Sequence, residues 1–311
     1  MSTTKAPAPV PAPKAMWRKP SGIWRIRSGV ARLTHARTWN RPVIEFFFRV
    51  VVAGARRQKS RFIGPIYKRV MLFTPAARKH TYGVLLPLNV DLASEADSAP
   101  LPIDLIKECL RSASYIASMQ TCVCRDSFKC TSHPHELCCL FLSKSGRRVV
   151  DHGIAYEMPL EDALRRVDEA ATQGLVGQAL WVEVEQFIWG LSNDDMDGFM
   201  EICFCCPCCC VGMAVCKNAT RDVKGHFHSS GYTALVDTST CIACGDCVPV
   251  CIGEAITLGD AAISIDQSSC VGCGLCIAPC PTSAIRIEQT GPVFPSLREQ
   301  FREQGRLDIV L

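Results

Sequence analysis

Eight cysteines between residues 241 and 281 constrain this chain more than any other feature, because they repeat one spacing. Each half reads C-x2-C-x2-C-x3-C, and the second half begins 29 residues after the first. The repeat comprises Cys241, Cys244, Cys247 and Cys251, followed by Cys270, Cys273, Cys276 and Cys280. Three cysteines this close on a tight loop can reach three corners of one iron–sulfur cube, whose fourth iron needs a ligand from elsewhere.

This section resembles the bacterial-type ferredoxins with two 4Fe-4S clusters, over about 60 of the 311 residues. In that family the fourth cysteine of each run binds the other cluster. The two ligand sets that the resemblance implies are Cys241, Cys244, Cys247 and Cys280 for one cluster, and Cys270, Cys273, Cys276 and Cys251 for the other. One departure is that Ile252, and not proline, follows Cys251, which leaves room for a different local turn.

Zinc is the alternative metal for these thiols, because tetrathiolate zinc sites also contain C-x2-C pairs. Such sites join two pairs over a longer interval and do not need two consecutive x2 spacings. Gly245 and Gly274 occupy positions where the backbone can approach a cluster closely and direct N–H groups at sulfur. We therefore favour two iron–sulfur clusters over zinc.

Thirteen further cysteines precede the repeat. Cys109 falls on a predicted helix, where a small buried hydrophobe is the simplest interpretation. The others form two groups, Cys122, Cys124, Cys130, Cys138 and Cys139, then Cys203, Cys205, Cys206, Cys208, Cys209, Cys210 and Cys216. Unliganded, such dense thiols would oxidise readily, which indicates metal binding. We expect both segments to be irregular, because a C-x-C pair serves one metal more easily from a loop than from a regular strand.

Two motifs in these segments, "CVCR" at 122–125 and "CFCCPCCC" at 203–210, resemble a cysteine-rich module of dicluster ferredoxin-like proteins of anaerobic bacteria and archaea. The resemblance covers residues from about 85 to 290. It implies one or two further iron–sulfur clusters upstream of the repeat, without implying a particular reaction.

Other polar residues in these segments could contribute to a metal site. Arg125 could donate a hydrogen bond or offset cluster charge, or it could be a surface arginine. Nitrogen ligands could come from His133, His135, His226 and His228, and the alternative is that these histidines are exposed loop residues.

Composition indicates a reducing compartment. The chain is 48% apolar and long enough to build a core without cross-links, so its 21 cysteines are not explained by disulfide stapling. Its first 20 residues contain no apolar stretch or cleavage site typical of a secretory signal. We expect a cytoplasmic protein of an anaerobe, with possible peripheral attachment to the inner face of the membrane.

The basic charge is concentrated at the start of the chain. Residues 1–80 hold 18 Lys and Arg against one acidic residue, Glu45, whereas the remainder holds 16 basic and 29 acidic residues. This asymmetry indicates an anionic membrane surface or an acidic redox partner, and we expect no nucleic acid. The apolar run at 43–55 is too short and charged to cross a bilayer, but could lie in its headgroup region.

The pattern of elements predicts an α+β protein. We expect a basic, partly helical N-terminal arm at 1–84, a cysteine-rich domain at 85–230, a two-cluster ferredoxin domain at 231–291 and a C-terminal tail at 292–311. Apolar periodicity predicts helices over 102–118 and from Pro159 to Gly174. Short alternating runs predict four strands, "YTALVD", "AITL", "AISID" and "AIRIE", around the cysteine repeat.

These features favour an electron-transfer protein or subunit that works with redox partner proteins in a larger oxidoreductase complex. The sequence contains no dinucleotide-binding glycine motif, P-loop or nucleophile–base arrangement. Whether the chain is itself an enzyme is left open. The alternative is an iron–sulfur reductase whose upstream cysteine-rich site binds substrate. A third, less favoured possibility is a zinc-binding or nucleic-acid-binding regulator that uses its basic arm.

Overall fold

The computed structural model describes residues 41–71, 82–87, 102–181, 188–189, 191, 200–218, 220, 227–229 and 231–290. Helices and strands mix along the chain, which confirms the α+β class. The first 40 residues of the predicted N-terminal arm and the tail at 292–311 lie outside the described residues.

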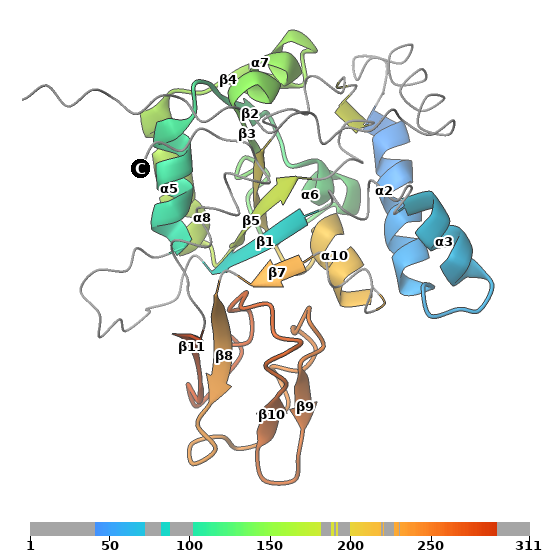
Figure 1. Ribbon diagram of the computed structural model, residues 1–311, viewed down its shortest axis with the longest axis vertical. Coiled ribbons are helices and arrows are strands. Elements are labelled where there is room, and N and C mark those ends of the chain that lie inside the picture. Colours follow the sequence, from blue (N-terminus) through green and yellow to red (C-terminus); the bar gives the residue numbers. More distant parts are fainter. Residues whose placement is uncertain are drawn as a thin grey trace, which may run out of the picture.

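A seven-stranded sheet forms the centre of the larger part of the molecule (Figure 1). In spatial order its strands are β4 (Ala155–Glu157), β2 (Ile116–Met119), β3 (Leu140–Leu142), β6 (Glu201–Cys205), β5 (Val176–Trp181), β1 (Tyr82–Pro87) and β7 (Phe227–Ser229). The described helices around it are α2 (Arg41–Arg56), α3 (Ile63–Met71), α5 (Pro102–Ser112), α6 (Val123–Phe128), α7 (Ser143–Asp151), α8 (Leu160–Thr172) and α10 (Val211–Asn218). All strand pairs are antiparallel except β1 with β7.

Alternation along the strands decides which side chains meet which layer. On β6, Ile202 and Phe204 belong to the core that includes α5 and α8, while Cys203 and Cys205 belong to a second buried cluster. This follows from the period of two in a strand, which sends successive side chains to opposite faces. The sheet therefore separates an ordinary apolar core from a face rich in thiols.

The helix predicted over 102–118 is too long. α5 ends at Ser112, and Ile116, which falls within the predicted helix, begins β2 and pairs with Leu142 on β3. All four residues of β2 are buried. Because β2 is buried on both faces, it lacks the alternation of polar and apolar residues that identifies a half-exposed strand. Ile116 therefore continued the apolar period of the preceding helix by chance.

The second predicted helix is correct in place. α8 begins after Pro159, which is its N-cap and not its first helical residue as expected. Gly174 ends α8 with a positive φ of 65° and donates its N–H to the carbonyl oxygen of Ala171. Glycine adopts this left-handed conformation without steric cost, which explains the stop.

The apolar run at 43–55 lies within α2, where Glu45 and Arg49, one turn apart, form an ion pair at 3.9 Å. Helix α2 packs along α6 and α10, and α3 folds back against it (Figure 1). Tyr67 of α3 lies over Gly54 and donates its hydroxyl proton to the carbonyl oxygen of Val51. Among the described residues, no helix is both long and apolar enough to cross a membrane.

The cysteine repeat forms a smaller β-rich unit below α10 in Figure 1. Its strands are β8 (Tyr232–Val236), β9 (Ile256–Leu258), β10 (Ile263–Ile265) and β11 (Ile285–Gln289), as predicted. They pair as two antiparallel ribbons, β8 with β11 and β9 with β10.

The 29-residue repeat extends to backbone detail. Asp237 and Asp266 each accept bonds from the backbone and side chain of a serine two residues later. Left-handed residues recur at the same offset, with Glu254 at φ 53° and Ser283 at φ 52°. The two halves are therefore copies of one loop design.

Gly272 marks a place where the two copies differ. Its counterpart Ala243 tolerates a φ of 51°, but a Cβ at Gly272 would lie 2.1 Å from the carbonyl oxygen of Tyr232.

We predict that Gly272→Ala destabilises the protein well beyond the roughly 1–2 kcal/mol of left-handed strain alone, with loss of bound iron. Gly245→Ala is the matched control, because its φ is also positive (80°) while its Cβ would meet only Leu258 at 3.4 Å. Anaerobic denaturation and iron analysis measure both effects, and equal destabilisation of the two variants would contradict the prediction.

Candidate metal centres

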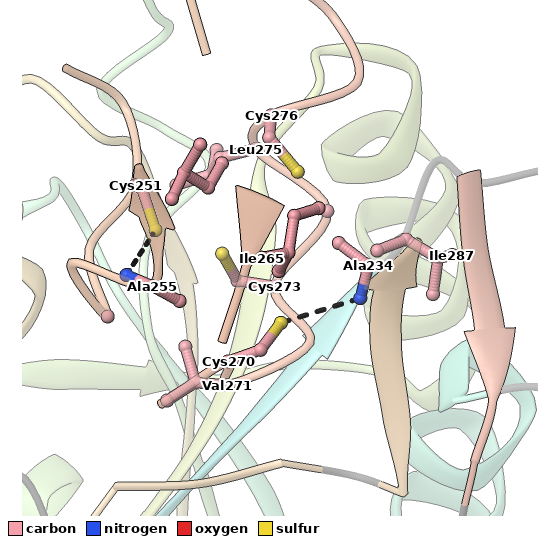
Figure 2. Close-up of a pocket in the computed structure, with 13 residues that line it drawn as sticks. Ala234, Cys251, Ala255, Ile265, Cys270, Val271, Cys273, Leu275, Cys276 and Ile287 are labelled. Atoms are coloured by element: carbon pink, nitrogen blue, oxygen red, sulfur yellow. Dashed lines mark hydrogen bonds between the residues drawn. The ribbon is translucent and has the colours of Figure 1, made fainter. Parts of the chain in front are cut away.

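The cysteines of the repeat surround two separate cavities. One is lined by Cys241, Cys244, Cys247 and Cys280. The other is lined by Cys251, Cys270, Cys273 and Cys276 (Figure 2). The fourth cysteine of each run thus lies with the first three of the other run, which is the arrangement that the resemblance implies.

Backbone N–H groups point at several of these sulfurs. Ala255 donates to Cys251 and Ala284 to Cys280, each at 3.2 Å and each four residues after the cysteine. Ala234 donates to Cys270 at 3.4 Å (Figure 2). Such bonds stabilise negative charge on sulfur, so this cradle fits a thiolate-bound 4Fe-4S cluster.

Ile252 leaves the local turn unchanged. The residue two positions beyond it, Glu254, has the same left-handed φ as Ser283, which follows Pro281 in the other copy. The difference lies in burial, because Ile252 is 2% exposed whereas Pro281 is exposed. Ile252 packs with upstream cysteines, where a proline would contribute less apolar surface.

The cross-over of ligands can be tested by combining variants. Cys280→Ala should remove about four iron atoms, because a cubane that loses one thiolate is not retained. Adding Cys241→Ala should remove no more iron, since both belong to one set, whereas adding Cys270→Ala should remove about four more. Iron and sulfide analysis of the anaerobic protein measures this. Cys109→Ala is the control, because Cys109 is fully buried in the apolar core, as expected. The assignment is wrong if the first pair loses both clusters.

Six upstream thiols form what we call the buried group: Cys122, Cys124, Cys139, Cys203, Cys205 and Cys210. Their sulfurs form a connected series, in which Cys139 lies 2.9 Å from Cys203. Cys124 and Cys205 both hydrogen-bond to Cys210, which lowers the pKa of Cys210 well below its usual range. Bonds to Cys139 and Cys205, with burial, raise the pKa of Cys203 well above its usual range. Six thiols gathered in this way are residues that could hold a thiophilic metal.

The expectation of irregular structure around these thiols is correct for the loop at 129–139 and the turn at 206–210, but it does not hold for the whole of either segment. Cys203 and Cys205 lie on the regular strand β6, and Cys124 lies on α6. A C-x-C pair on a strand points both sulfurs to one face, and here the face is closed by the turn at Cys210 and by Cys139 beside β3. The other cysteines of the buried group lie on segments that pack against β6, so the strand itself remains regular.

Sequence reasoning missed two polar residues that contact the buried group. Glu201 is 2% exposed, accepts a bond from the Cys203 thiol at 2.8 Å, and has its other carboxylate oxygen buried without a hydrogen-bond partner in the described part of the chain. Gln178, fully buried on β5, accepts a bond from Cys205 at 3.3 Å. The sequence did contain one signal for Glu201. It lies two residues before Cys203 in a strand-like run, so both side chains are on the same face of the strand.

Four other thiols form what we call the turn group: Cys130, Cys206, Cys208 and Cys209. All four sulfurs lie within 4.8 Å of one another. Cys130 follows the left-handed C-cap of α6 at Lys129, and the other three lie on the turn that leads from β6 into α10.

Arg125 lies beside both groups and is completely buried, so the surface-arginine alternative is wrong. Its guanidinium donates to the carbonyl oxygens of Pro134 at 2.9 Å, Leu137 at 2.6 Å and Phe204 at 2.8 Å. The guanidinium also hydrogen-bonds to Cys206 and interacts electrostatically with the nearby Cys122 sulfur. A buried cation of this kind offsets the negative charge of thiolates.

The remaining predicted ligands lie elsewhere. Cys138 turns away from its neighbour Cys139 and donates to the carbonyl oxygen of Met119 at 2.8 Å. Cys216 lies on α10 with its thiol 3.9 Å from the carbonyl oxygen of Ile252. Both are thus outside the buried and turn groups.

The histidines differ among themselves. Both ring nitrogens of His135 are engaged, with Asp126 at 3.0 Å and the Cys130 carbonyl oxygen at 2.8 Å, so that ring supports the loop. The ring of His133 has a buried Nδ1 without a hydrogen-bond partner in the described residues. His226 and the side chain of His228 lie outside the described residues.

Comparison with known proteins agrees with the geometry of the repeat. The family model of the 4Fe-4S dicluster domain matches residues 234–287. The C-terminal part of the chain is therefore a ferredoxin-like dicluster domain, and the chain binds 4Fe-4S clusters there. Neither the curated proteins nor the solved structures contain a significant match to this chain.

The dicluster domain and the buried group meet in one packed layer. Ile252 joins Cys203, Cys205 and Cys210 in a buried apolar cluster. Three residues of the cavity in Figure 2 lie against it, namely Val271, Cys273 and Leu275. Lys217 of α10 donates to the carbonyl oxygen of Pro249, and Lys59 lies 3.7 Å from Glu254, so polar contacts surround this layer.

Proposed function

We propose that this protein is an electron-transfer subunit in which the dicluster domain exchanges electrons with an additional iron–sulfur centre on the buried group. The packed layer that joins the Cys273 side of the dicluster domain to Cys203, Cys205 and Cys210 supports this proposal best. When bound, 4Fe-4S clusters supply reversible one-electron transfer. The chain's contribution is to pack both thiol sets against one buried apolar layer.

Burial favours electron transfer over the alternative of a substrate-reducing site. Cys203, Cys205 and Cys210 are each at most 9% exposed, and Glu201 closes the group from within the sheet. A substrate needs an open approach to metal, whereas an electron can pass through a packed protein interior. The outer edge of the dicluster domain, where Cys244 is exposed, is suited to contact with a redox partner.

The proposal predicts a larger electron capacity than the dicluster domain alone provides. Anaerobic protein should contain about twelve or more iron atoms and accept more than two electrons per chain, since two cubanes account for about eight irons and two electrons. Cys205→Ser should lower the capacity to about two electrons and leave the dicluster signals unchanged. Reductive titration followed by EPR measures this, with Cys138→Ser as the matched control. Wild-type protein with only eight irons and two electrons would contradict the proposal.

We further propose that α2 and α3 attach the protein to an anionic bilayer surface. Five large apolar side chains on this helical pair and its loop are exposed, namely Phe46, Val50, Phe62, Ile63 and Ile66. Basic residues surround them, with exposed Arg56, Arg57, Lys59 and Arg61 between the helices. Apolar side chains rimmed by cations match the headgroup region of an anionic leaflet.

The double variant Phe62→Ser and Ile66→Ser tests this surface. Binding to vesicles that contain phosphatidylserine should weaken by at least about tenfold, which is the effect of about 1.4 kcal/mol of lost apolar burial. Leu258→Ser is the matched control, because Leu258 is also exposed (51%) but lies on the dicluster domain. Sedimentation with vesicles at low and physiological salt measures the effect. Wild-type protein that does not sediment with these vesicles would contradict membrane attachment and favour a protein partner.

A further inference from the structure

We propose that the turn group binds one mononuclear metal ion, Zn²⁺ or Fe²⁺, through the thiolates of Cys130, Cys206, Cys208 and Cys209. This site is distinct from the dicluster domain and from the buried group. It goes beyond the proposed function, because it assigns four of the upstream thiols to a single ion and leaves six for an iron–sulfur centre.

The spacing of the sulfurs carries the proposal. All four lie within 4.8 Å of one another, and the sulfurs of Cys130 and Cys208 are 3.7 Å apart. A tetrahedral ion with metal–sulfur distances of about 2.3 Å places its ligands about 3.8 Å from one another. A disulfide would need about 2.05 Å, so this pair is not positioned as one. The cysteines of the dicluster domain instead surround cavities, as a larger cofactor requires.

Backbone hydrogen bonds hold the two loops that present these thiols. Cys130 donates its backbone N–H to the carbonyl oxygen of Arg125 at 2.9 Å, which reverses the chain after α6. The N–H groups of Ser132 and His133 point at the Cys130 sulfur. On the other side, the N–H of Cys210 bonds to the carbonyl oxygen of Cys206 at 3.2 Å and closes the turn.

Charge also favours an ion at this position. Four thiolates and one divalent ion carry a net charge of about −2, and the buried guanidinium of Arg125 lies against Cys206 to offset part of it. All four coordination positions are filled by protein, which is typical of a structural or electron-transfer site and not of a catalytic one. The ion would join Cys130 to a turn 78 residues further along the chain.

The experiment uses the full-length chain purified without air. Zinc and iron are counted per chain, and X-ray absorption identifies the ligands of each metal. We expect one equivalent of zinc with four sulfur ligands, or one equivalent of iron with the EPR signal of a mononuclear ferric tetrathiolate after mild oxidation. Each of these two results supports the site and identifies its metal.

Cys208→Ser and Cys130→Ser should each remove that single equivalent and leave the iron of the dicluster domain in place. Cys208 is exposed, so its substitution should be tolerated by the fold. Cys138→Ser is the matched control, because this neighbouring thiol faces Met119 and not the turn group. The proposal is overturned if the wild-type protein holds no mononuclear metal, or if Cys208→Ser removes about four irons together, as a cubane would. Loss of the buried-group iron in Cys205→Ser, with the single ion retained, separates this inference from the proposed function.

Discussion

The buried guanidinium of Arg125 is the interaction on which the upstream half of the protein depends. Removing an arginine from water is costly unless its donors and its charge are matched. Here three backbone carbonyl oxygens accept its protons, two from the loop at 134–137 and one from Phe204 on β6. One side chain therefore ties the loop after α6 to the strand that carries Cys203 and Cys205, and it faces sulfur in both thiol groups.

Side-chain alternation on β6, together with the turn that follows it, explains why so many thiols fit in so small a volume. Strand β6 sends Ile202 and Phe204 into the apolar core and Cys203 and Cys205 to the opposite face. The turn that follows splits its cysteines, with Cys210 joining the buried group and three others joining Cys130. Adjacent cysteines thus belong to different thiol groups because the backbone points them in different directions.

The dicluster domain is placed so that the face of one cavity meets the buried group. Ile252, which replaces the usual proline, supplies apolar surface at this contact, and α10 lies along its edge. Helix α2 lies against α6 and α10 and α3 lies against α2, while the outer surface of this helical pair presents apolar and basic side chains. In the function proposed above, this order places a basic apolar surface at one side, the upstream thiols in the middle and the ferredoxin-like domain at the other.

The sequence by itself determined the dicluster domain, the thiols that line its two cavities, its four strands and the position of α8. These depend on local spacing, turn glycines and short-range periodicity, which are visible along the chain. Tertiary structure alone decided the rest: the end of α5 before Ile116, the burial of Arg125 and Glu201, and the division of twelve upstream cysteines between two groups and two outlying thiols. The reason is physical, because contacts such as Cys139 with Cys203 and Cys130 with Cys208 join residues 64 and 78 positions apart. Only the packing of sheet against helices selects which sulfurs meet.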